Sequence, residues 1–437
     1  MAKTRVAVLT DFFEADSTYS LNIIAEEQLA MLKRAGYDPI GVVQEDFKPQ
    51  RIWGDVEIRH IPRMPHHNQI KFVEDHDKRV AELTAALDTA LDGVDVVITH
   101  DMIYQPAELI LNFAAHRWAK ENPDVTWLNW VHSFTPSAIW STPDPRLREV
   151  QTHMRRSFVV YPNHWAVERV ARNFKCEVDQ VAVVPHPTDT CSFLGFQDIT
   201  TRFVQDTRLL DYDFIMTYPV RLDRGKQVEH VMNVAAGLWS IGRGAAVVVV
   251  DFHSTGGDKV EYRNWLKKHA VDLGIADHVH FTSEYDESLC LRAPREMVRD
   301  LMLISNVFVM PSKSETYSLI AQEAALCGSF LVLNWDFQPF LSIYGEHAAY
   351  FKFSANVDIM DRHLPPPPPG QVYFTNTDYG KAGAVGYARN IALRVAYEHD
   401  HNDVMNQRTR VRKERNAGAI FRRYIEPLFY AFDGSPR

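Results

Sequence analysis

Short apolar runs alternate along the chain with longer segments in which apolar residues recur every three or four positions. Arg5–Leu9 (RVAVL) has the β-rich composition of a strand, and residues 21–35 carry an apolar stripe at helical spacing. Gly36 follows this stripe as the type of residue that commonly ends a helix. Because strands and helices alternate, the pattern predicts a parallel sheet with helices on both faces.

The pattern forms two series, which predict two doubly wound domains. The first series has predicted strands at Arg5–Leu9, Pro39–Val43, Val94–Thr99, Thr126–Val131, Phe158–Tyr161 and Val181–Val184, with helices near 21–35, 76–91, 105–120 and 164–174. The second series has strands at Phe214–Tyr218, Ala245–Val250, His278–Phe281, Val307–Val309 and Phe330–Leu333, with helices near 228–238, 260–273, 295–304 and 317–327. Ala245–Val250 is apolar throughout, as expected for a buried parallel strand.

We place the domain boundary near residues 195–212, which gives an N-terminal domain of residues 1–205 and a C-terminal domain of residues 206–415. Aromatic residues in the segment 416–437 favour its packing back onto the body of the protein. The alternative is one large sheet, which would be unusually wide for this many strands. Pro365–Pro369 is a five-proline run, which is most simply a stiff surface loop.

The composition is that of a folded chain, with 46% hydrophobic and 24% charged residues among 437. It excludes a disordered or collagen-like protein. The formal net charge of −9 argues against nucleic acid as the default partner, although a local basic patch can override the total. The longest uninterrupted apolar run, Ala245–Val250, is far shorter than a membrane span.

The cysteines favour a reducing compartment. No two of them form a C-x-x-C pair, and no His/Cys cluster has the spacing of a metal site. The four are Cys176, Cys191, Cys290 and Cys327. The first residues, MAKTRVAVLTDFFEAD, have a short apolar core followed by acidic residues, which predicts a first strand and not a secretory signal. We therefore expect a cytoplasmic protein without a bound metal.

The segment Val307–Gly328 (VFVMPSKSETYSLIAQEAALCG) carries the most chemical information. An apolar strand leads through a polar loop to Glu315, and a helix is predicted to begin near Thr316. The start of a helix presents free backbone N–H groups and the positive end of the helix dipole, which together bind phosphate. These N–H groups would belong to Thr316, Tyr317, Ser318 and Leu319. Glu315 could then hold hydroxyls of whatever the phosphate carries, and Glu323 could hold a ribose diol two turns further along.

This segment resembles the E-x7-E signature of retaining GT-B glycosyltransferases. The resemblance is to the large nucleotide-sugar-dependent family, glycosyltransferase family 4-like, that includes sucrose synthases and bacterial mannosyltransferases. The pair of glutamates alone is a weak signal, since acidic residues are common in helices. The order of strand, Pro-Ser, Glu315, hydroxylated and aromatic residues and Glu323 is much more specific than an ordinary helix start.

A second segment, Tyr218–Gln227 (YPVRLDRGKQ), resembles the family's G-R-L-x-x-x-K-G motif, with Arg221 and Lys226 at the matching positions. Two cations just past a strand lie where a diphosphate should bind, at the carboxyl edge of a parallel sheet. Taken alone, this segment would be interpreted as a surface loop with ordinary salt bridges. The glutamate motif favours the functional interpretation.

The N-terminal half resembles the family more loosely. His100 and Asp101 follow a predicted strand, as the family's His-Asp pair does, and His132 lies in a segment (NWVHS) that resembles the strand with the family's second histidine. Val183–Asp189 (VVPHPTD) resembles the segment before the interdomain linker, with His186 in place of an asparagine. The family commonly has a Gly-Gly pair after the first strand, but residues 10–20 of this chain contain no glycine. Asp11 and Asp16 could contact an acceptor there, or Asp16 could cap the next helix.

The resemblance implies an α/β protein of the GT-B fold, with two Rossmann-like domains facing each other across a cleft. The C-terminal domain would hold the nucleotide-sugar and the N-terminal domain the acceptor, and the segment after about residue 416 would cross back to the N-terminal domain. The implied reaction is transfer of a hexosyl or pentosyl group with retained anomeric configuration. A metal ion or an additional cofactor is not expected.

The resemblance also implies roles for individual residues. Arg221, Lys226 and the helix N-terminus would stabilise the leaving diphosphate. Glu323 would bind the ribose and Glu315 the hydroxyls of the transferred sugar. His132 would lie near the transferred sugar, with Asp11, Asp16, His100 and Asp101 on the acceptor side.

The charge pattern favours a neutral hydroxyl acceptor, such as a saccharide or small metabolite. Asp11, Glu14 and Asp16 would repel a polyanion, and the one obvious compensating run is Arg408–Arg423. The alternative acceptor is a hydroxymethylated base in DNA, as in viral enzymes that share this fold. A GT-B epimerase or phosphorylase is a competing enzyme, and a catalytically inactive nucleotide-sugar-binding protein is a competing interpretation of another class.

Overall fold

The computed structural model describes residues 4–12, 19–63, 69–134, 137–254, 256–312, 315, 317–353 and 376–433. The described chain divides into two compact units, residues 1–188 with 417–437 and residues 189–416, which we call the N-terminal and C-terminal domains. The alternative of one large sheet is therefore wrong. The Pro365–Pro369 run lies outside the described residues.

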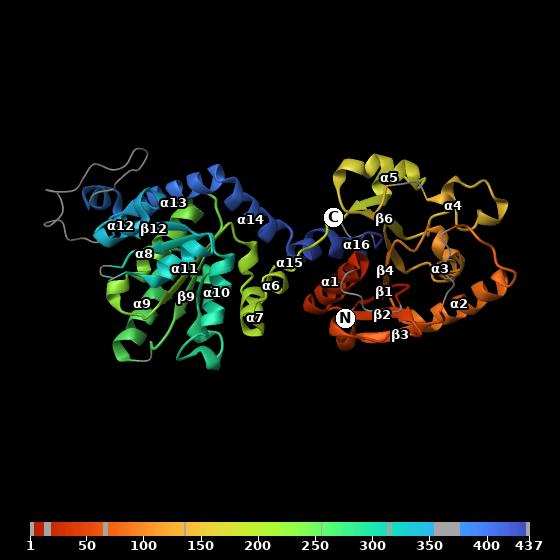
Figure 1. The fold of residues 1–437 in the computed structure, drawn as a ribbon, viewed down its shortest axis with the longest axis horizontal. Coiled ribbons are helices and arrows are strands. Elements are labelled where there is room, and N and C mark those ends of the chain that lie inside the picture. Colours follow the sequence, from red (N-terminus) through yellow and green to blue (C-terminus); the bar gives the residue numbers. More distant parts are fainter. Residues whose placement is uncertain are drawn as a thin grey trace. The chain divides into compact units, whose positions relative to one another are not determined.

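The N-terminal domain is built on a parallel sheet (Figure 1), which has seven strands within the described residues, in the order β3-β2-β1-β4-β5-β6-β7. Its strands are β1 (Arg5–Leu9), β2 (Asp38–Gln44), β3 (Glu57–Ile61), β4 (Val96–His100), β5 (Thr126–Trp130), β6 (Ser157–Tyr161) and β7 (Val181–Val183). Its helices are α1 (Ser20–Arg34), α2 (His76–Ala90), α3 (Leu109–Glu121), α4 (Ala138–Ser141) and α5 (Val167–Asn173). The strand order reverses between β1 and β4, where an open parallel sheet binds its ligand at the carboxyl ends.

Both faces of this sheet are buried, because successive residues of a strand point to opposite faces. Val6 and Val8 of β1 pack in a core with α1 and the C-terminal segment, whereas Ala7 and Leu9 pack in a second core with α2 and α3. β3 is not among the strands predicted from periodicity, because this edge strand has the polar sequence EIRHI and is only partly buried.

The last residues of the chain belong to the N-terminal domain. α15 (Ala417–Ile420), a π-helical turn (Phe421–Ile425) and α16 (Glu426–Phe429) follow one another without a break. The rings of Phe421 and Phe429 pack edge-on against Tyr37, at centroid distances of 5.4 and 5.5 Å. The Tyr37 hydroxyl donates to Glu426 at 2.7 Å. This segment therefore covers one face of the N-terminal sheet.

The C-terminal domain repeats the same plan, with parallel strands in the orders β10-β9-β8 and β11-β12-β13. Its strands are β8 (Phe214–Val220), β9 (Ala245–Asp251), β10 (Val279–Phe281), β11 (Val307–Met310), β12 (Phe330–Asn334) and β13 (Ala349–Phe351). Its helices are α6 (Thr190–Phe193), α7 (Asp198–Asp206), α8 (Val228–Ser240), α9 (Gly257–Asp272), α10 (Arg295–Ile304), α11 (Leu319–Leu326), α12 (Gln338–Tyr344), α13 (Asn376–His401) and α14 (Asp403–Glu414).

Asn306 joins the two groups of strands. Its backbone N–H donates to the Ile215 carbonyl at 3.3 Å, and its side-chain oxygen accepts from the Ile215 N–H at 3.0 Å. β11 therefore lies beside β8, and the six strands follow the order of a Rossmann fold, with the reversal between β8 and β11. The N-terminal end of this domain differs from the sequence-based boundary, because residues 189–205 pack on it. Cys191, Phe203 and Val204 share a core with Ile215 and Val248.

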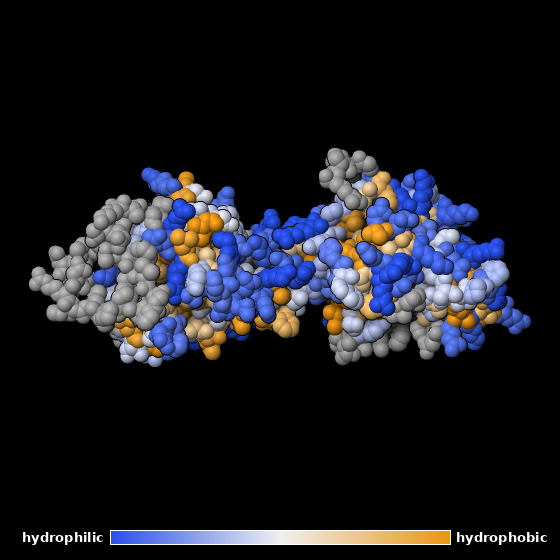
Figure 2. Space-filling view, turned by 90° about the horizontal axis from the view of Figure 1, so that it is seen from above, coloured by the Kyte–Doolittle hydropathy of each residue, from blue (hydrophilic) through white to orange (hydrophobic). Residues whose placement is uncertain are grey.

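On the face that Figure 2 shows, hydrophilic residues cover most of the coloured surface of each domain, and hydrophobic residues form separate groups. Within the residues that the structure describes, no helix is long and apolar enough to cross a membrane.

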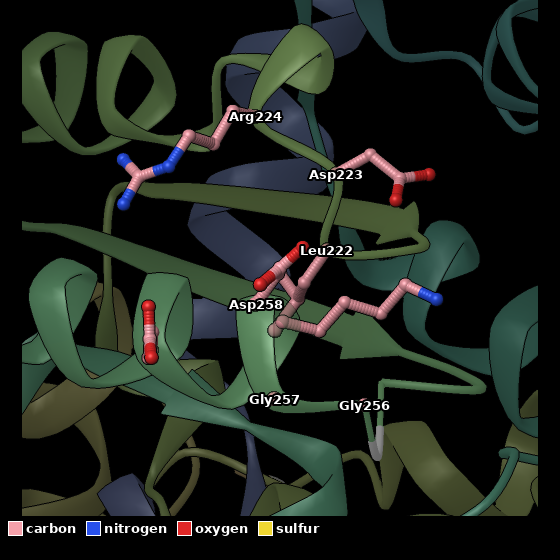
Figure 3. A pocket seen from close by; sticks show the side chains of 8 residues that line it. Leu222, Asp223, Arg224, Gly256, Gly257 and Asp258 are labelled. Atoms are coloured by element: carbon pink, nitrogen blue, oxygen red, sulfur yellow. The ribbon is translucent and has the colours of Figure 1, made fainter.

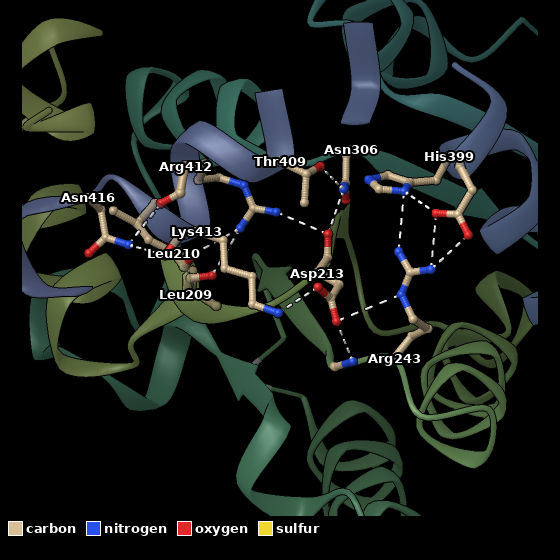
Figure 4. Close-up of polar contacts among 12 residues, drawn as sticks. Leu209, Leu210, Asp213, Arg243, Asn306, His399, Thr409, Arg412, Lys413 and Asn416 are labelled. Carbon is tan, nitrogen blue, oxygen red and sulfur yellow. Dashed lines mark hydrogen bonds and ion pairs between the residues drawn. The ribbon is translucent and has the colours of Figure 1, made fainter. Parts of the chain in front are cut away.

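α14, which carries the first part of the basic run Arg408–Arg423, is tied to the C-terminal domain (Figure 4). Arg412 is 6% exposed and donates to the carbonyls of Leu209, Leu210 and Asp213, at 3.4, 3.4 and 3.1 Å. Burial lowers the pKa of Arg412 to about 10. Lys413 contacts the Asp213 carboxylate at 2.6 Å.

Arg408 is also engaged, since it donates to the carbonyls of Leu303 and Cys327 at 3.0 and 3.1 Å. The guanidinium groups of Arg408 and Arg412 therefore anchor α14 to the domain and are not a free basic surface. The reason is that α14 packs against backbone carbonyls that only the folded domain brings together.

We expect Arg412→Met to destabilise the protein by about 2–4 kcal/mol, because charged hydrogen bonds to buried carbonyls contribute roughly 1.5–3 kcal/mol. Arg410→Met is a matched control on the same helix. Arg410 is 67% exposed and pairs with Glu414 on the surface, so its loss should cost no more than about 0.5 kcal/mol. Urea unfolding of both variants measures the difference. Equal stability of the two variants would contradict the anchoring role of Arg412.

Candidate active site

The carboxyl edge of the C-terminal sheet brings Lys226 and Glu315 together. β8 ends at Val220, and the chain turns through Arg221 and one 3₁₀ turn, η7 (Arg224–Lys226), before α8 begins. Glu315 lies in the loop between β11 and α11. The Lys226 ammonium donates to the Glu315 carboxylate. The predicted phosphate-binding cation and the predicted sugar-binding carboxylate thus meet where the strand order reverses.

Buried groups fix the backbone beside Lys226. The Tyr218 hydroxyl donates to the Lys226 carbonyl at 3.1 Å. Burial, and then the negative charge of Glu315, raise the pKa of Tyr218, so this hydroxyl keeps its proton. Gln227 follows with φ 52°, in the left-handed region, and its side chain donates to the Phe353 carbonyl at 3.3 Å. The family motif has a glycine at this position, and here a buried glutamine holds the conformation that glycine adopts easily.

Arg221, the second predicted cation, lies at the surface. Its Nε atom is 2.5 Å from Oδ2 of Asp223, and its side chain is 56% exposed. An exposed pair of this kind contributes little to stability. Arg221 can therefore exchange this partner for a phosphate at small cost.

The helix after Glu315 begins later than predicted. α11 is Leu319–Leu326, and the residue before it, Ser318, has φ 65°. A left-handed residue cannot lie inside an α-helix, so the predicted start near Thr316 was wrong by about one turn. With Ser318 as the N-cap, the free N–H groups at the helix start belong to Ser318 and to the first residues from Leu319 onward. Thr316 itself lies outside the described residues.

The residues around this helix start differ in exposure. Tyr317 is half-exposed, and its hydroxyl accepts from the Gln322 amide at 3.1 Å. Ser318 is buried and donates to the Met310 sulfur at 3.1 Å. Leu319 is 69% exposed. Tyr317 and Leu319 are thus accessible to a ligand, whereas the Ser318 side chain is engaged in a contact within the protein.

Glu323 pairs with Arg295 of α10 at 2.8 Å. The Arg295 side chain is 85% exposed, which makes this a solvent-screened ion pair of small net energy. A ribose diol could replace it, so the pair is compatible with the predicted role of Glu323.

Sequence reasoning missed Asn334, the last residue of β12. Its buried amide nitrogen donates to the carbonyls of Pro311 and Ser312 at 3.4 and 3.0 Å. This contact holds the start of the loop that carries Glu315. An asparagine at the end of an apolar strand (FLVLN) was the signal that could have identified it.

A pocket of about 570 Å³ lies at the carboxyl ends of β8 and β9 (Figure 3). Its lining combines the loop after β8 with the start of α9. The residues are Leu222, Asp223, Arg224, Gly256, Gly257, Asp258, Lys259 and Glu261. The pocket is polar and carries charges of both signs, so it suits a ligand with hydroxyl groups as well as phosphate.

The N-terminal domain gathers three histidines at the carboxyl edge of its sheet. His100 ends β4, and its Nδ1 atom is 3.1 Å from Nε2 of His132, which follows β5. The rings of His132 and His186 stack with centroids 5.2 Å apart. Burial lowers the pKa of His132 and of His186 to about 4, and it lowers the pKa of His100 as well. All three side chains are therefore neutral at pH 7.

His100, which we expected on the acceptor side, is 3% exposed. Its Nε2 atom is 2.8 Å from Oε1 of Gln28, on α1. With both ring nitrogens engaged, His100 is placed to act through His132 and not on a ligand directly.

Two predicted acceptor-side carboxylates lie near the same cluster. Oδ1 of Asp101 accepts from the His132 backbone N–H at 3.0 Å, and burial raises the pKa of Asp101. Burial first, and then the negative charges of Asp11 and Asp101, raise the pKa of Tyr19. Both carboxylates therefore lie near the Tyr19 hydroxyl. Asp16 lies outside the described residues. Across the described part of the chain, no group of three or more His, Cys, Asp or Glu side chains could hold a metal ion.

Residues 200–347 match the family model described as Glycosyl transferases group 1. The matched segment begins in α7 and includes Arg221, Lys226, Glu315 and Glu323. No match was found among curated proteins.

Several solved structures are similar to this chain at low sequence identity. A glycosyltransferase from Rickettsia africae is 11% identical over 100% of both chains, with a TM-score of 0.37. Sucrose-phosphate synthase from Thermosynechococcus elongatus is 14% identical over 99% of this chain and 100% of its own, with a TM-score of 0.35. HepE of Anabaena in complex with UDP is 12% identical over 99% of this chain and 98% of its own, with a TM-score of 0.31.

The two Rossmann-like parallel sheets and the family match agree on a two-domain GT-B fold. The matched family also supports glycosyl transfer as the general activity of the C-terminal domain.

Proposed function

We propose that this protein is a retaining glycosyltransferase of the family 4 type, which moves a sugar from a nucleotide diphosphate-sugar to a neutral hydroxyl acceptor. The observation that carries the proposal is the contact between Lys226 and Glu315. A cation for the diphosphate and a carboxylate for the sugar meet at the reversal of the strand order, within the segment that matches the family model.

On the donor side, Lys226 and Arg221 would bind the diphosphate together with the N–H groups at the start of α11. Negative charge develops on the diphosphate as the bond to the sugar breaks, and preorganised cations stabilise that charge. In the free protein Lys226 is paired with Glu315, so donor binding would replace a carboxylate oxygen by a phosphate oxygen at Lys226. Glu315 would then be released to accept hydrogen bonds from the sugar hydroxyls.

Retention of configuration requires the acceptor to approach the face of the sugar that the diphosphate leaves. The acceptor oxygen forms a bond to the anomeric carbon, the carbon–phosphate oxygen bond breaks, and the acceptor proton passes to the departing phosphate. The nucleotide-sugar is the donor substrate in this scheme, and no further cofactor or metal takes part. His132 would contact the transferred sugar, with Asp11 and Asp101 nearer the acceptor.

The charge distribution supports a neutral acceptor. Asp11 and Asp101 lie near the three histidines, which are neutral at pH 7, so this edge of the N-terminal sheet would repel a polyanion. The basic run Arg408–Arg423 was the feature that favoured DNA, and Arg408 and Arg412 use their guanidinium groups on backbone carbonyls. We therefore favour a saccharide or small metabolite as acceptor. We also propose that the reaction takes place in the cytoplasm.

Nucleotide-sugars can be screened by thermal shift to identify the donor. A ligand at 100 times its dissociation constant adds roughly 2.7 kcal/mol of stability. Hydrolysis of the stabilising donor, with and without candidate acceptors, then separates an enzyme from an inactive binding protein.

Lys226→Met should lower turnover by roughly 10²–10³, because one preorganised group that stabilises the leaving diphosphate is lost. Lys267→Met is the control. Lys267 pairs with Glu284 on the surface of α9, and its loss should leave turnover within about twofold. Steady-state rates of both variants with the identified donor measure the effect. Unchanged turnover in a folded Lys226→Met protein would exclude this residue from the phosphate site.

Glu323→Gln should weaken binding of the free nucleoside diphosphate by roughly 1.5–3 kcal/mol, because a charged hydrogen bond to the ribose is lost. Glu315→Gln should leave this affinity intact and lower turnover, since Glu315 is assigned to the sugar. Calorimetry with the nucleoside diphosphate alone tests the division of roles. Arg295→Gln is the control, because it removes the surface partner of Glu323 but no ligand contact. Equal loss of affinity in both glutamate variants would contradict the assignment.

The KM for a neutral acceptor, measured at saturating donor, should change little between 50 and 200 mM salt. Binding that neutralises 6–10 phosphates of DNA would instead weaken by roughly 10³–10⁵ over this range. Transfer assays with saccharides and with duplex DNA that contains hydroxymethylated bases distinguish the two acceptors. Transfer to the DNA that disappears as salt is raised would overturn the preference for a neutral acceptor.

A further inference from the structure

A chain of hydrogen bonds runs from α1 to His132 inside the N-terminal domain. Gln28 is 3% exposed, and its side-chain oxygen is 2.8 Å from Nε2 of His100. Nδ1 of His100 is 3.1 Å from Nε2 of His132. Three side chains from α1, the end of β4 and the segment after β5 are thus connected in series.

The direction of this chain follows from proton counting. A neutral imidazole has one N–H and one bare nitrogen. The side-chain oxygen of Gln28 can only accept a hydrogen bond, so the proton of His100 lies on Nε2. Nδ1 of His100 is then bare and accepts from Nε2–H of His132. Nδ1 of His132 is left without a proton and can only accept a hydrogen bond.

The surroundings keep these rings neutral. His100 also packs against Trp130 at a centroid distance of 5.4 Å, and His186 stacks on the other side of His132. The acidic groups near the cluster are Asp101, which accepts from the His132 backbone N–H, and Asp11, which acts with it on Tyr19. A second proton on His100 would occupy Nδ1, the nitrogen that accepts the hydrogen bond from His132.

We propose that Gln28 and His100 are positioning residues that hold His132 in the tautomer protonated at Nε2, so that Nδ1 accepts a hydrogen bond from a substrate hydroxyl. The first half of this proposal concerns the protein alone. The second half rests on the proposed glycosyltransferase function. A bare imidazole nitrogen can only accept a hydrogen bond, so it recognises a hydroxyl group, which can donate one. It does not recognise a carboxylate or a phosphate, which would also act as acceptors.

The tautomer can be measured directly by ¹⁵N NMR on the full chain labelled at histidine, with His132→Asn used to assign the signals. Wild-type protein at pH 7 should show His132 protonated at Nε2 and bare at Nδ1. Gln28→Met, which has similar size but no acceptor, should give a mixture of tautomers. Gln28→Glu is the matched variant that keeps an acceptor and should preserve the wild-type tautomer.

The opposite tautomer in wild-type protein, with the proton on Nδ1 of His132, would overturn the proposal, because it would mean that the Gln28 amide donates to His100. An unchanged tautomer in Gln28→Met would also overturn it. Neither result depends on finding the donor or the acceptor. The tautomer assignment can therefore fail while the proposed function stands. The proposed function can likewise fail while the tautomer assignment stands.

The kinetic half is tested with the donor that the thermal-shift screen identifies. Gln28→Met should lower kcat by roughly three- to tenfold, the loss of one neutral hydrogen bond, with an unchanged dissociation constant for the nucleoside diphosphate. Gln28→Glu should restore most of kcat and move the acidic limb of the pH–rate profile upward, because a carboxylate beside His100 favours the protonated ring. Equal kcat in wild type and Gln28→Met would overturn the role of the tautomer in the reaction.

Discussion

Both sheets of this protein are parallel and carry helices on both faces, so side chains that meet a ligand can lie only at the ends of the strands. In the C-terminal domain the loops after β8 and β11 flank the reversal of strand order and bring Lys226 to Glu315. In the N-terminal domain the ends of β4 and β5 bring His100 to His132. The same packing constraint therefore creates one candidate site in each domain.

The two sites differ in the charge of their side chains. In the C-terminal domain, cations lie in partly exposed ion pairs that a diphosphate could enter at small cost. In the N-terminal domain, burial keeps the histidines neutral and raises the pKa of Asp101. Such a difference between the two sites would suit a reaction with a charged leaving group in the C-terminal domain and a neutral hydroxyl acceptor in the N-terminal domain.

Buried asparagine and glutamine side chains support the two sites, and a buried arginine anchors α14 at the amino end of β8. Asn334 fixes the start of the loop that leads to Glu315, Arg412 fixes α14 to three carbonyls, and Gln28 orients His100. Each satisfies polar groups that would otherwise be unpaired in the interior, where a missing hydrogen bond is costly. Substitution of Asn334 or Gln28 should disturb the sites although neither residue is assigned a contact with substrate.

The sequence by itself determined the alternation of strands and helices and the parallel sheets, and it placed Arg221, Lys226 and Glu315 in loops that follow strands. These features depend on local periodicity and on residue types at strand ends, which a single chain displays directly. Only the tertiary structure decided that α11 starts at Leu319, that residues 189–205 pack on the C-terminal core, that Arg412 is buried and that Gln28 reaches His100. Each of these depends on contacts between residues far apart in the chain, for which local patterns carry no signal.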